Sequence, residues 1–313
     1  MSTTWWLQRK RRNGHVIIFP WFWAIFTVIA AIAQTARNAM QRELTTSLGT
    51  VGATHVRFLF GFPFVLVFLV GVSIVSGSRP LLPGLTFWPW TIVGALAQVA
   101  ATALMLTAMS ERSFVVTIAY IKTEPIQVAV FGLVFLGDRL TSPMLVAIVI
   151  ATAGVVLMST KPGGMVGGIR PTLIGLASAA MFALSSIGYR GGILSLGWPN
   201  FVMTATFTLA VGIAMQTVLL SFYLMLRNPA ALFAIMRAWK PSLFAGFMGA
   251  VASQFWFLAF ALATAASVRT LALVEVLFAQ MAARFAFGQK TTAREVAGMF
   301  LIVGGVGLLL WAY

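Results

Sequence analysis

The sequence contains no cysteine, only two histidines and only six acidic residues among its 313 residues. The absence of cysteine excludes disulfide bonds, thiolate metal sites and cysteine nucleophiles. His15 and His55 are too few, and too close to the ends of apolar runs, to indicate a metal site. Intramembrane catalysis would need a nucleophile with its base or a metal cluster, and the sequence shows neither pattern. We therefore expect no enzyme, no catalytic residue, no metal and no cofactor.

Charged residues are also scarce, at 9%, whereas 60% of the residues are hydrophobic and the mean hydropathy is +0.96. No water-soluble core of this size requires so many apolar residues. The predicted fold class is therefore an all-α polytopic membrane protein. A spanning helix needs ~20 apolar residues, and the sequence divides into about ten such runs: 16–36, 51–75, 88–109, 114–135, 143–159, 171–190, 200–226, 242–264, 266–287 and 294–313.

The formal net charge of +15 would suggest a nucleic-acid partner for a soluble protein. Here most arginines and lysines lie between the hydrophobic runs, where such residues set topology and contact lipid headgroups, so we expect no nucleic acid. The basic segment 8–12 precedes the first run and favours a cytoplasmic N-terminus, although most basic loop residues would then lie outside. The competing interpretation of this region is a signal peptide cleaved after Ala31-Ile32-Ala33.

Two acidic residues, Glu124 and Glu275, are isolated carboxylates inside apolar runs. A charge at bilayer depth costs at least ~2.5 kcal/mol, so such residues indicate substrate, ion or proton sites. Both glutamates are candidates for proton coupling, because burial disfavours the charged form of a carboxyl group. Thr123-Glu124-Pro125 adds a predicted helix interruption, since proline cannot donate a hydrogen bond to the carbonyl of Ile121.

The two glutamates occupy matching positions in an internal repeat. A shift of 151 positions superposes Glu124 on Glu275, Gly137 on Gly288, Thr141 on Thr292, and Gly154 on Gly305. If each half has five spans, an odd number, the halves must insert with opposite orientations and form an inverted repeat. The predicted organisation is a basic cytoplasmic tail (1–15), a first five-helix repeat (16–160), a linker (161–170) and a second five-helix repeat (171–313), with the C-terminus also cytoplasmic.

Several segments in this order resemble a known family. They are Val56-Arg57-Phe58-Leu59 in the second run, Thr123-Glu124-Pro125 in the fourth, Gly137-Asp138-Arg139-Leu140-Thr141 after it, the small-residue segment Ala147 to Leu157, and the segment Gly175 to Arg190. Together they resemble the EamA-like members of the drug/metabolite transporter superfamily over nearly the whole chain. The sequence departs from the family pattern at Gln289, where an acid is usual, and at Val276, which replaces the proline that would follow Glu275.

This resemblance implies ten helices around a central cavity, alternating access, and export of small metabolites such as amino acids or organic anions across the bacterial inner membrane. The polar residues support a cavity, because they fall on single helix faces at helical spacing and lipid-facing amides would be unsatisfied. The predicted substrate-binding residues are Gln34, Arg37, Asn38, Gln98, Tyr120, Glu124, Tyr189, Gln254, Trp256 and Glu275.

Simpler roles remain open for many of these side chains. The amides and serines can bond neighbouring helices to one another, at about 0.6 kcal/mol each. Arg57 and Arg190 lie near run ends, where long side chains can reach the membrane interface. Lys122 and Arg269 can do the same or can pair with a different helix. A cavity role and a structural role are therefore both compatible with the sequence.

The cations within or bordering the runs outnumber the two glutamates, which favours a small polar substrate with a negative or zwitterionic group. The cations are Arg37, Arg57, Lys122, Arg190, Arg269 and Arg284. Proton-coupled efflux of cationic drugs or quaternary ammonium compounds is the alternative. A channel is less favoured, since the only glycine-patterned loop, 161–168, reads as a linker. The expected partners are the lipid bilayer, the substrate and protons.

Small residues such as Gly175 and Ala179 favour packing within the protomer, so a monomer or a weak homodimer is expected.

Overall fold

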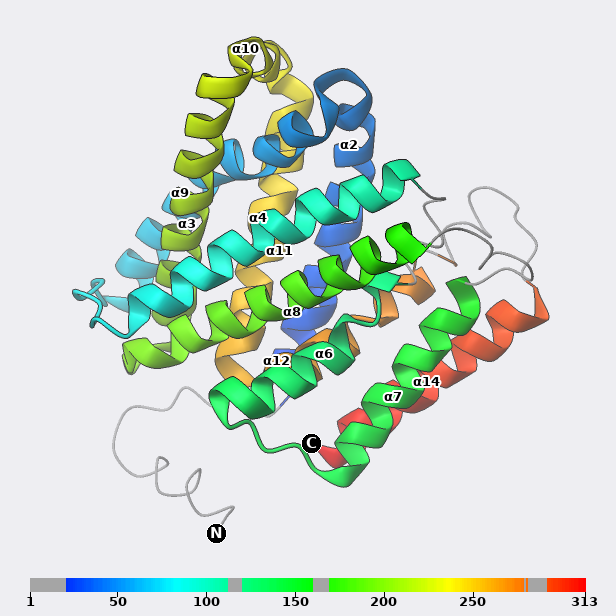
Figure 1. Cartoon of the computed structure of the whole chain (residues 1–313). Helices are drawn as coiled ribbons and strands as arrows, with labels where there is room; N and C mark the ends of the chain where they lie inside the picture. The colour runs from blue at the N-terminus through cyan, green and yellow to red at the C-terminus, as the bar shows by residue number, and fades with distance from the viewer. Residues whose placement is uncertain (1–20, 112–119, 160–168, 279, 281–291) are drawn as a thin grey trace.

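The computed structural model describes residues 21–111, 120–159, 169–278, 280 and 292–313. This part of the chain is built of helices and contains no strand (Figure 1). In chain order the helices are α2 (Phe22–Leu59), α3 (Gly61–Ser76), α4 (Phe87–Glu111), α6 (Glu124–Phe131), the π-helical turn η2 (Gly132–Leu136), α7 (Ser142–Ser159), α8 (Ile169–Leu196), α9 (Phe201–Arg227), α10 (Pro229–Arg237), α11 (Trp239–Leu262), α12 (Ala265–Leu271) and α14 (Ala293–Ala312).

Helix α2 contains the described part of the first predicted run and the beginning of the second, and Gly49 lies between them. The backbone of Gly49 has φ 68° and ψ 174°, a conformation that only glycine adopts without strain. The first run therefore ends before Gly49, and the second begins at Val51 and continues through α3 to Ser76. A glycine within one helical segment thus separates two candidate spans.

Six helices in the described part of the chain are long and apolar enough to cross a membrane. Three shorter apolar helices, Phe22–Arg37, Glu124–Leu136 and Ser142–Met158, cover further predicted runs. The chain is therefore a polytopic membrane protein. The count of ten spans stays a prediction, because residues 114–119 of the fourth run and residues 279 and 281–287 of the ninth run lie outside the described part. Helix α10 was not predicted, and its nine residues are too few to span a bilayer.

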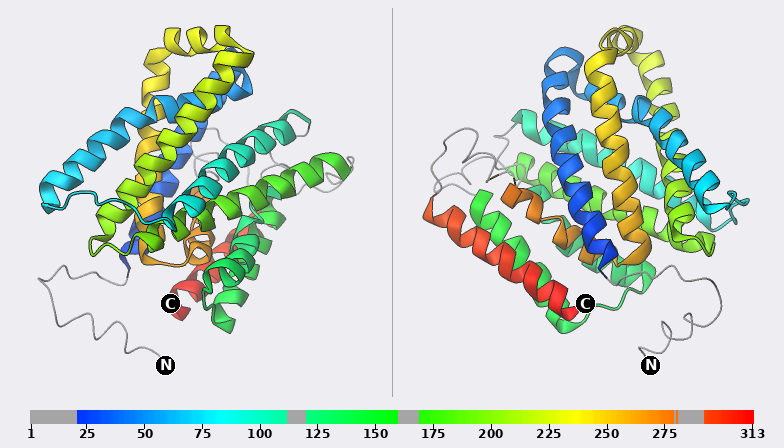
Figure 2. Two further views of the ribbon diagram at one scale, coloured as in Figure 1. Left: turned by 60° about the vertical axis from the view of Figure 1, so that its left-hand side comes forward. Right: turned by 180° about the vertical axis from the view of Figure 1, so that it is seen from behind.

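The helices pack mainly as three close pairs, α4 with α8, α2 with α11, and α7 with α14 (Figures 1 and 2). Glycine makes two of these approaches possible. A Cβ atom on Gly188 of α8 would lie 2.6 Å from the nitrogen of Gly94 on α4, and one on Gly154 of α7 would lie 2.7 Å from the carbonyl oxygen of Gly298 on α14. In a membrane such close packing replaces the hydrophobic effect as the force that joins helices.

The start of the first helix and the end of the last lie at the same end of the molecule. The rings of Trp23 and Tyr313 are 4.7 Å apart between centroids, and the Tyr313 hydroxyl donates to the carbonyl of Leu262 at the end of α11, at 3.3 Å. The two ends of the described chain therefore lie close together.

Candidate substrate-binding site

The helix that carries Glu124 is interrupted just before this residue. Lys122 and Thr123 form a turn between helical residues 120–121 and α6, and the amide of Ile126 donates to the carbonyl of Thr123 at 3.2 Å. Pro125 in the first turn of α6 cannot continue the hydrogen bonding of the preceding helix. The interruption expected from the sequence is therefore observed, and it places Glu124 at the N-terminal, electropositive end of α6.

A second interruption precedes Glu275 and was not predicted, because no proline stands nearby. Ala272 and Leu273 form a turn between α12 and the helical residues 274–278, and the amide of Glu275 donates to the carbonyl of Ala272 at 3.0 Å. The two turns are 150 positions apart, close to the shift of 151 that relates the glutamates. Both isolated carboxylates thus lie directly after a break in their helix.

Each glutamate forms an ion pair with a cation from the other half of the sequence. Glu124 Oε1 lies 3.0 Å from Arg269 Nε, and Glu275 Oε2 lies 3.1 Å from Lys122 Nζ. All four side chains are largely buried, with exposed fractions between 12% and 19%. Of the two roles left open for Lys122 and Arg269, the structure therefore selects pairing with a different helix. These four residues are called the reciprocal pairs below.

Neighbouring side chains orient the reciprocal pairs. Ser186 on α8 accepts a hydrogen bond from Arg269 Nε at 2.9 Å and donates one to Glu124 Oε1 at 3.4 Å. The guanidinium carbon of Arg269 lies 4.8 Å from the centre of the Trp256 ring, a cation–π contact. Side chains from α8 and α11 therefore hold the Glu124–Arg269 pair.

Gln34 connects the other pair to the same tryptophan. Its amide nitrogen donates to Glu275 Oε2 at 3.3 Å, and its amide oxygen accepts a hydrogen bond from the indole nitrogen of Trp256 at 3.1 Å. Trp256, which is only 5% exposed, therefore contacts Arg269 with its ring and Gln34 with its indole N–H. The structure thus brings together four predicted residues, Gln34, Glu124, Trp256 and Glu275.

Two further arginines extend this cluster. Arg37 and Arg57 are 6% and 9% exposed, and both lie against Gly249, where an added Cβ would be 3.3 Å from Arg37 Cδ and from Arg57 Cγ. Arg37 lies within electrostatic reach of Arg57, Arg269 and Glu275. The alternative that Arg57 reaches the membrane interface is therefore wrong, since its side chain is directed into the protein.

Gln98 and Tyr189 form a second polar network. The Tyr189 hydroxyl donates to Gln98 Oε1 at 3.2 Å, and the same oxygen accepts a hydrogen bond from Gln216 Nε2 at 2.8 Å. Tyr189 also lies within electrostatic reach of Arg57, which connects this network to the charged cluster. Gln216 on α9 was not predicted.

The remaining predicted residues lie elsewhere or cannot be placed. Gln254 donates to Thr206 Oγ1 at 2.8 Å and so joins α11 to α9. The Tyr120 hydroxyl accepts a hydrogen bond from Thr172 Oγ1 at 3.0 Å, and the Tyr120 side chain packs on Gly175 of α8. Gln254 and Tyr120 therefore join neighbouring helices to each other. The side chain of Asn38 lies outside the described part of the structure.

Arg190 does not reach the membrane interface, which was one alternative for it. Its guanidinium donates to the carbonyls of Phe260 and Ala263 at the end of α11 and pairs with Asp138, whose Oδ1 is 3.4 Å from Nη2. The sequence does not predict this ion pair, because Asp138 and Arg190 are 52 positions apart. Ser186 could have been found, since it precedes Tyr189 by three positions and shares its helix face.

In the residues that the structure describes, no group of three or more histidine or acidic side chains could hold a metal ion. The site consists instead of paired charges, amides and aromatic rings at two helix breaks. Broken helices that carry charged side chains at membrane depth can bind a polar solute, because the freed backbone groups and helix ends become available to it.

Comparison with known proteins concerns the fold and the family of the chain. Twenty-nine chains of solved structures match the chain. One, a crystal structure described only as that of a protein, covers 93% of this chain and 97% of its own, with a TM-score of 0.66 and 16% sequence identity, so the likeness concerns the fold. No curated protein matches the chain. The model of the EamA-like transporter family matches residues 21–160. This family is part of the drug/metabolite transporter superfamily, and the match confirms, for residues 21–160, the resemblance expected from the sequence motifs.

Proposed function

We propose that the protein is a secondary active transporter that exports a small polar metabolite with an anionic or zwitterionic group, such as an amino acid or an organic anion. The observation that carries the proposal is the pair of reciprocal ion pairs, Glu124–Arg269 and Lys122–Glu275, at two helix breaks. The family model that matches residues 21–160 describes non-enzymatic membrane transporters. In a transporter, charges buried within the membrane typically bind the transported solute or a coupling ion.

The charge balance of the cluster favours an anionic group on the substrate. Its described members include the four cations Arg37, Arg57, Lys122 and Arg269 and the two carboxylates. A substrate carboxylate can bind to this excess of cations while each glutamate keeps a cationic partner, so no buried charge is left unpaired, a state that costs several kcal/mol. A cationic drug would instead have to displace a cation from a glutamate, and this disfavours the alternative.

Protons can drive the cycle through Glu124. Export driven by proton entry requires that the proton and the substrate exclude each other at a shared site. The ionised Glu124 can attract the ammonium group of a zwitterionic substrate while Arg269 attracts its carboxylate, and protonation of Glu124 from the outside would end this attraction and release the substrate. Glu275 would then contribute to substrate orientation through Lys122 and Gln34, which contact it at 3.1 and 3.3 Å.

Alternating access by two inverted five-helix repeats, residues 16–160 and 171–313, is part of the proposal. The related glutamates and the matching breaks support it. The packing supports it too: exchange of the halves converts the pair α4–α8 into α11–α2 and returns α7–α14 to itself. Because the two ends of the described chain meet at Trp23 and Tyr313, both termini are assigned to the cytoplasmic side of the bacterial inner membrane.

Transport is tested in proteoliposomes. Uptake of radiolabelled amino acids and dicarboxylates, with tetraphenylphosphonium as the cationic comparison, is measured with and without a pH gradient. We expect saturable flux of an anionic or zwitterionic solute. Saturable flux of tetraphenylphosphonium alone would reverse the substrate assignment, and flux near diffusion rates would indicate a channel. An untargeted comparison of metabolites released by cells with and without the protein would then identify the solute.

Topology is tested with single cysteines in this naturally cysteine-free chain. We expect Ser2→Cys and Tyr313→Cys to react with a membrane-impermeant maleimide only after the cells are opened. Labelling of both residues in intact cells would reverse the orientation. Labelling of only one would give an odd number of spans and remove the repeat.

A further inference from the structure

Arg57 on α2 is a buried cation without a carboxylate partner in the part of the chain that the structure describes. Three other largely buried cations form ion pairs: Lys122 with Glu275, Arg190 with Asp138, and Arg269 with Glu124. Arg57 is 9% exposed, and no ion pair or hydrogen bond of its guanidinium is observed among the described residues. A buried charge that nothing compensates is strongly unfavourable, so the site is complementary to an anion from outside the chain.

The Arg57 side chain lies at the contact between α2 and α11. A Cβ atom on Gly249 of α11 would be 3.3 Å from Arg57 Cγ, so the absence of a side chain at Gly249 leaves room for the arginine stem. The guanidinium carbon is 5.2 Å from the centre of the Phe58 ring. Nε is the one guanidinium nitrogen that is completely enclosed without a partner. The two terminal nitrogens are therefore the part of the guanidinium that a solute can contact.

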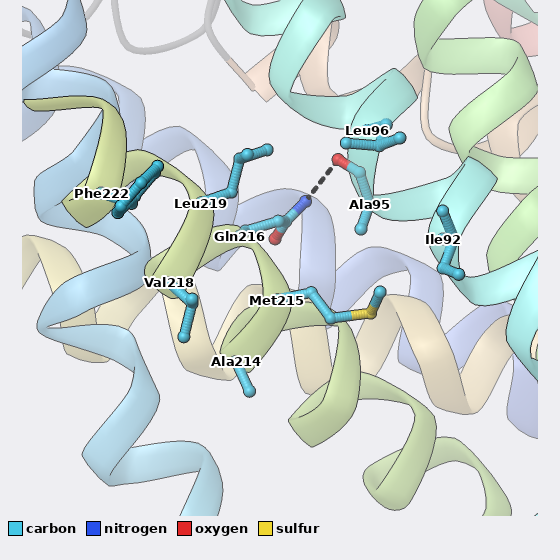
Figure 3. A pocket seen from close by; sticks show the side chains of 9 residues that line it. All are labelled: Ile92, Ala95, Leu96, Ala214, Met215, Gln216, Val218, Leu219 and Phe222. Atoms are coloured by element: carbon cyan, nitrogen blue, oxygen red, sulfur yellow. Dashed lines mark hydrogen bonds between the residues drawn. The ribbon is translucent and has the colours of Figure 1, made fainter. Parts of the chain in front are cut away.

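Tyr189 is not the missing anion, although it lies within electrostatic reach of Arg57. Its hydroxyl donates to Gln98 Oε1 at 3.2 Å. The same oxygen accepts a hydrogen bond from Gln216 Nε2, which also donates to the carbonyl of Ala95 at 3.2 Å (Figure 3). Because the Tyr189 proton takes part in this network, the phenol is neutral and does not compensate the charge of Arg57.

Arg57 is close enough to the reciprocal pairs to share a small solute with them. Gly249, against which Arg57 packs, precedes Trp256 by seven positions on α11, so the two residues lie on one helix face about 10 Å apart along the axis. The Trp256 ring in turn contacts Arg269, the partner of Glu124. A solute with one end at the Glu124–Arg269 pair can therefore place its other end at Arg57.

We propose that Arg57 binds a negatively charged group of the substrate, separate from any carboxylate held by Arg269, and that the transported solutes therefore carry a net negative charge. This inference rests on the proposed function and narrows its substrate class to dicarboxylates and acidic amino acids. A neutral zwitterion would place its ammonium group at Glu124 and its carboxylate at Arg269, and Arg57 would still lack an anion. One additional negative charge on the solute compensates it.

The first test compares acids with amides of the same shape. Proteoliposomes that contain the full-length protein are given radiolabelled glutamate or glutamine, aspartate or asparagine, and succinate or succinamate. For at least one pair we expect a half-saturation concentration about tenfold lower for the acid than for the amide, the effect of one charge-assisted hydrogen bond. Arg57→Gln should abolish this difference. A preference for the acid that persists in Arg57→Gln would assign the charge recognition to another residue and overturn the inference.

The same measurement separates this inference from the proposed function. Saturable uptake of the amides with no preference for the acids would retain the transporter of zwitterions and overturn the role of Arg57. Absence of saturable uptake of all six solutes would overturn it as well. Saturable flux of tetraphenylphosphonium alone would overturn the proposed function itself.

The second test needs no solute. Arg57→Met replaces the uncompensated charge with an apolar side chain and should raise the midpoint of denaturant unfolding in detergent, because the folded state then no longer encloses an unpaired charge. Arg190→Met is the matched control, since it removes a cation that is paired with Asp138, and it should lower the midpoint. A midpoint that falls as far in Arg57→Met as in Arg190→Met would show that Arg57 serves the fold, and would overturn the inference.

Discussion

Glu124 and Glu275 occupy equivalent places in the sequence, and yet the structure supports them differently. Glu124 follows a break explained by Pro125, and its partner Arg269 is also held by Ser186 and by the Trp256 ring. Glu275 follows a break without a proline, and its partners are the flexible Lys122 and the amide of Gln34. The comparison teaches that a repeated carboxylate can serve two roles, one in a rigidly organised pair and one in an adaptable pair.

The largest expected difference concerns proton coupling. Glu124→Gln should abolish transport driven by a pH gradient and preserve folding and substrate exchange, because the amide mimics the protonated acid. Glu275→Gln should reduce transport less, since its pair serves mainly to orient the substrate. Proteoliposome flux with and without the gradient measures both. Gradient dependence that persists in each single variant and in the double variant would remove protons from this site.

The cations should differ in their effect on stability. Arg269→Gln leaves Glu124 without its partner in a largely buried position, and loss of one member of such a pair typically costs about 3–5 kcal/mol. Lys122→Gln should cost less, because Lys122 is the most exposed of the four side chains, at 19%, and forms fewer contacts. Denaturant unfolding in detergent measures both effects. The double variant Glu124→Gln/Arg269→Gln should recover part of the loss, and equal losses in the two single variants would contradict the comparison.

A smaller effect is expected at Ser186, which contacts the Glu124 pair and the carbonyl of Phe182 on its own helix. Ser186→Ala removes a hydrogen bond to Arg269 and one to Glu124, each worth about 0.5–1.5 kcal/mol. The concentration of substrate at half-maximal flux should rise severalfold with little change in maximal rate. Ser185→Ala on the same helix is the matched control, since no contact of Ser185 with either pair is observed in the described residues. An equal change in both variants would assign Ser186 to packing.

The smallest effect is expected outside the cluster, at Gln254. Gln254→Leu loses the hydrogen bond to Thr206 and should cost about 0.6 kcal/mol of stability, with unchanged half-maximal substrate concentration. Flux and unfolding measured on the same preparation separate these two effects. A large change in substrate affinity would instead show that Gln254 belongs to the binding site, as the sequence pattern predicts.

The sequence predicts the fold class well, because hydropathy and span length alone decide whether a chain enters a bilayer. It also predicts the break at Pro125, since this residue lacks an amide hydrogen whatever its surroundings. It does not predict the break at Ala272 and Leu273, where no residue of special backbone geometry stands, because this break depends on packing against other helices. Helix α10 was not predicted either, although Asn228 caps it and Pro229 stands in its first turn.

The sequence by itself determined that the protein is a polytopic membrane protein with two isolated carboxylates in related segments. Only the tertiary structure decided that Glu124 pairs with Arg269 and Glu275 with Lys122, that Arg190 binds Asp138 and the end of α11, and that Gln254 joins two helices instead. The physical reason is range. Hydropathy and helical spacing are local properties of neighbouring residues, whereas an ion pair requires two side chains within about 4 Å, and helix packing brings such residues together from distant parts of the chain.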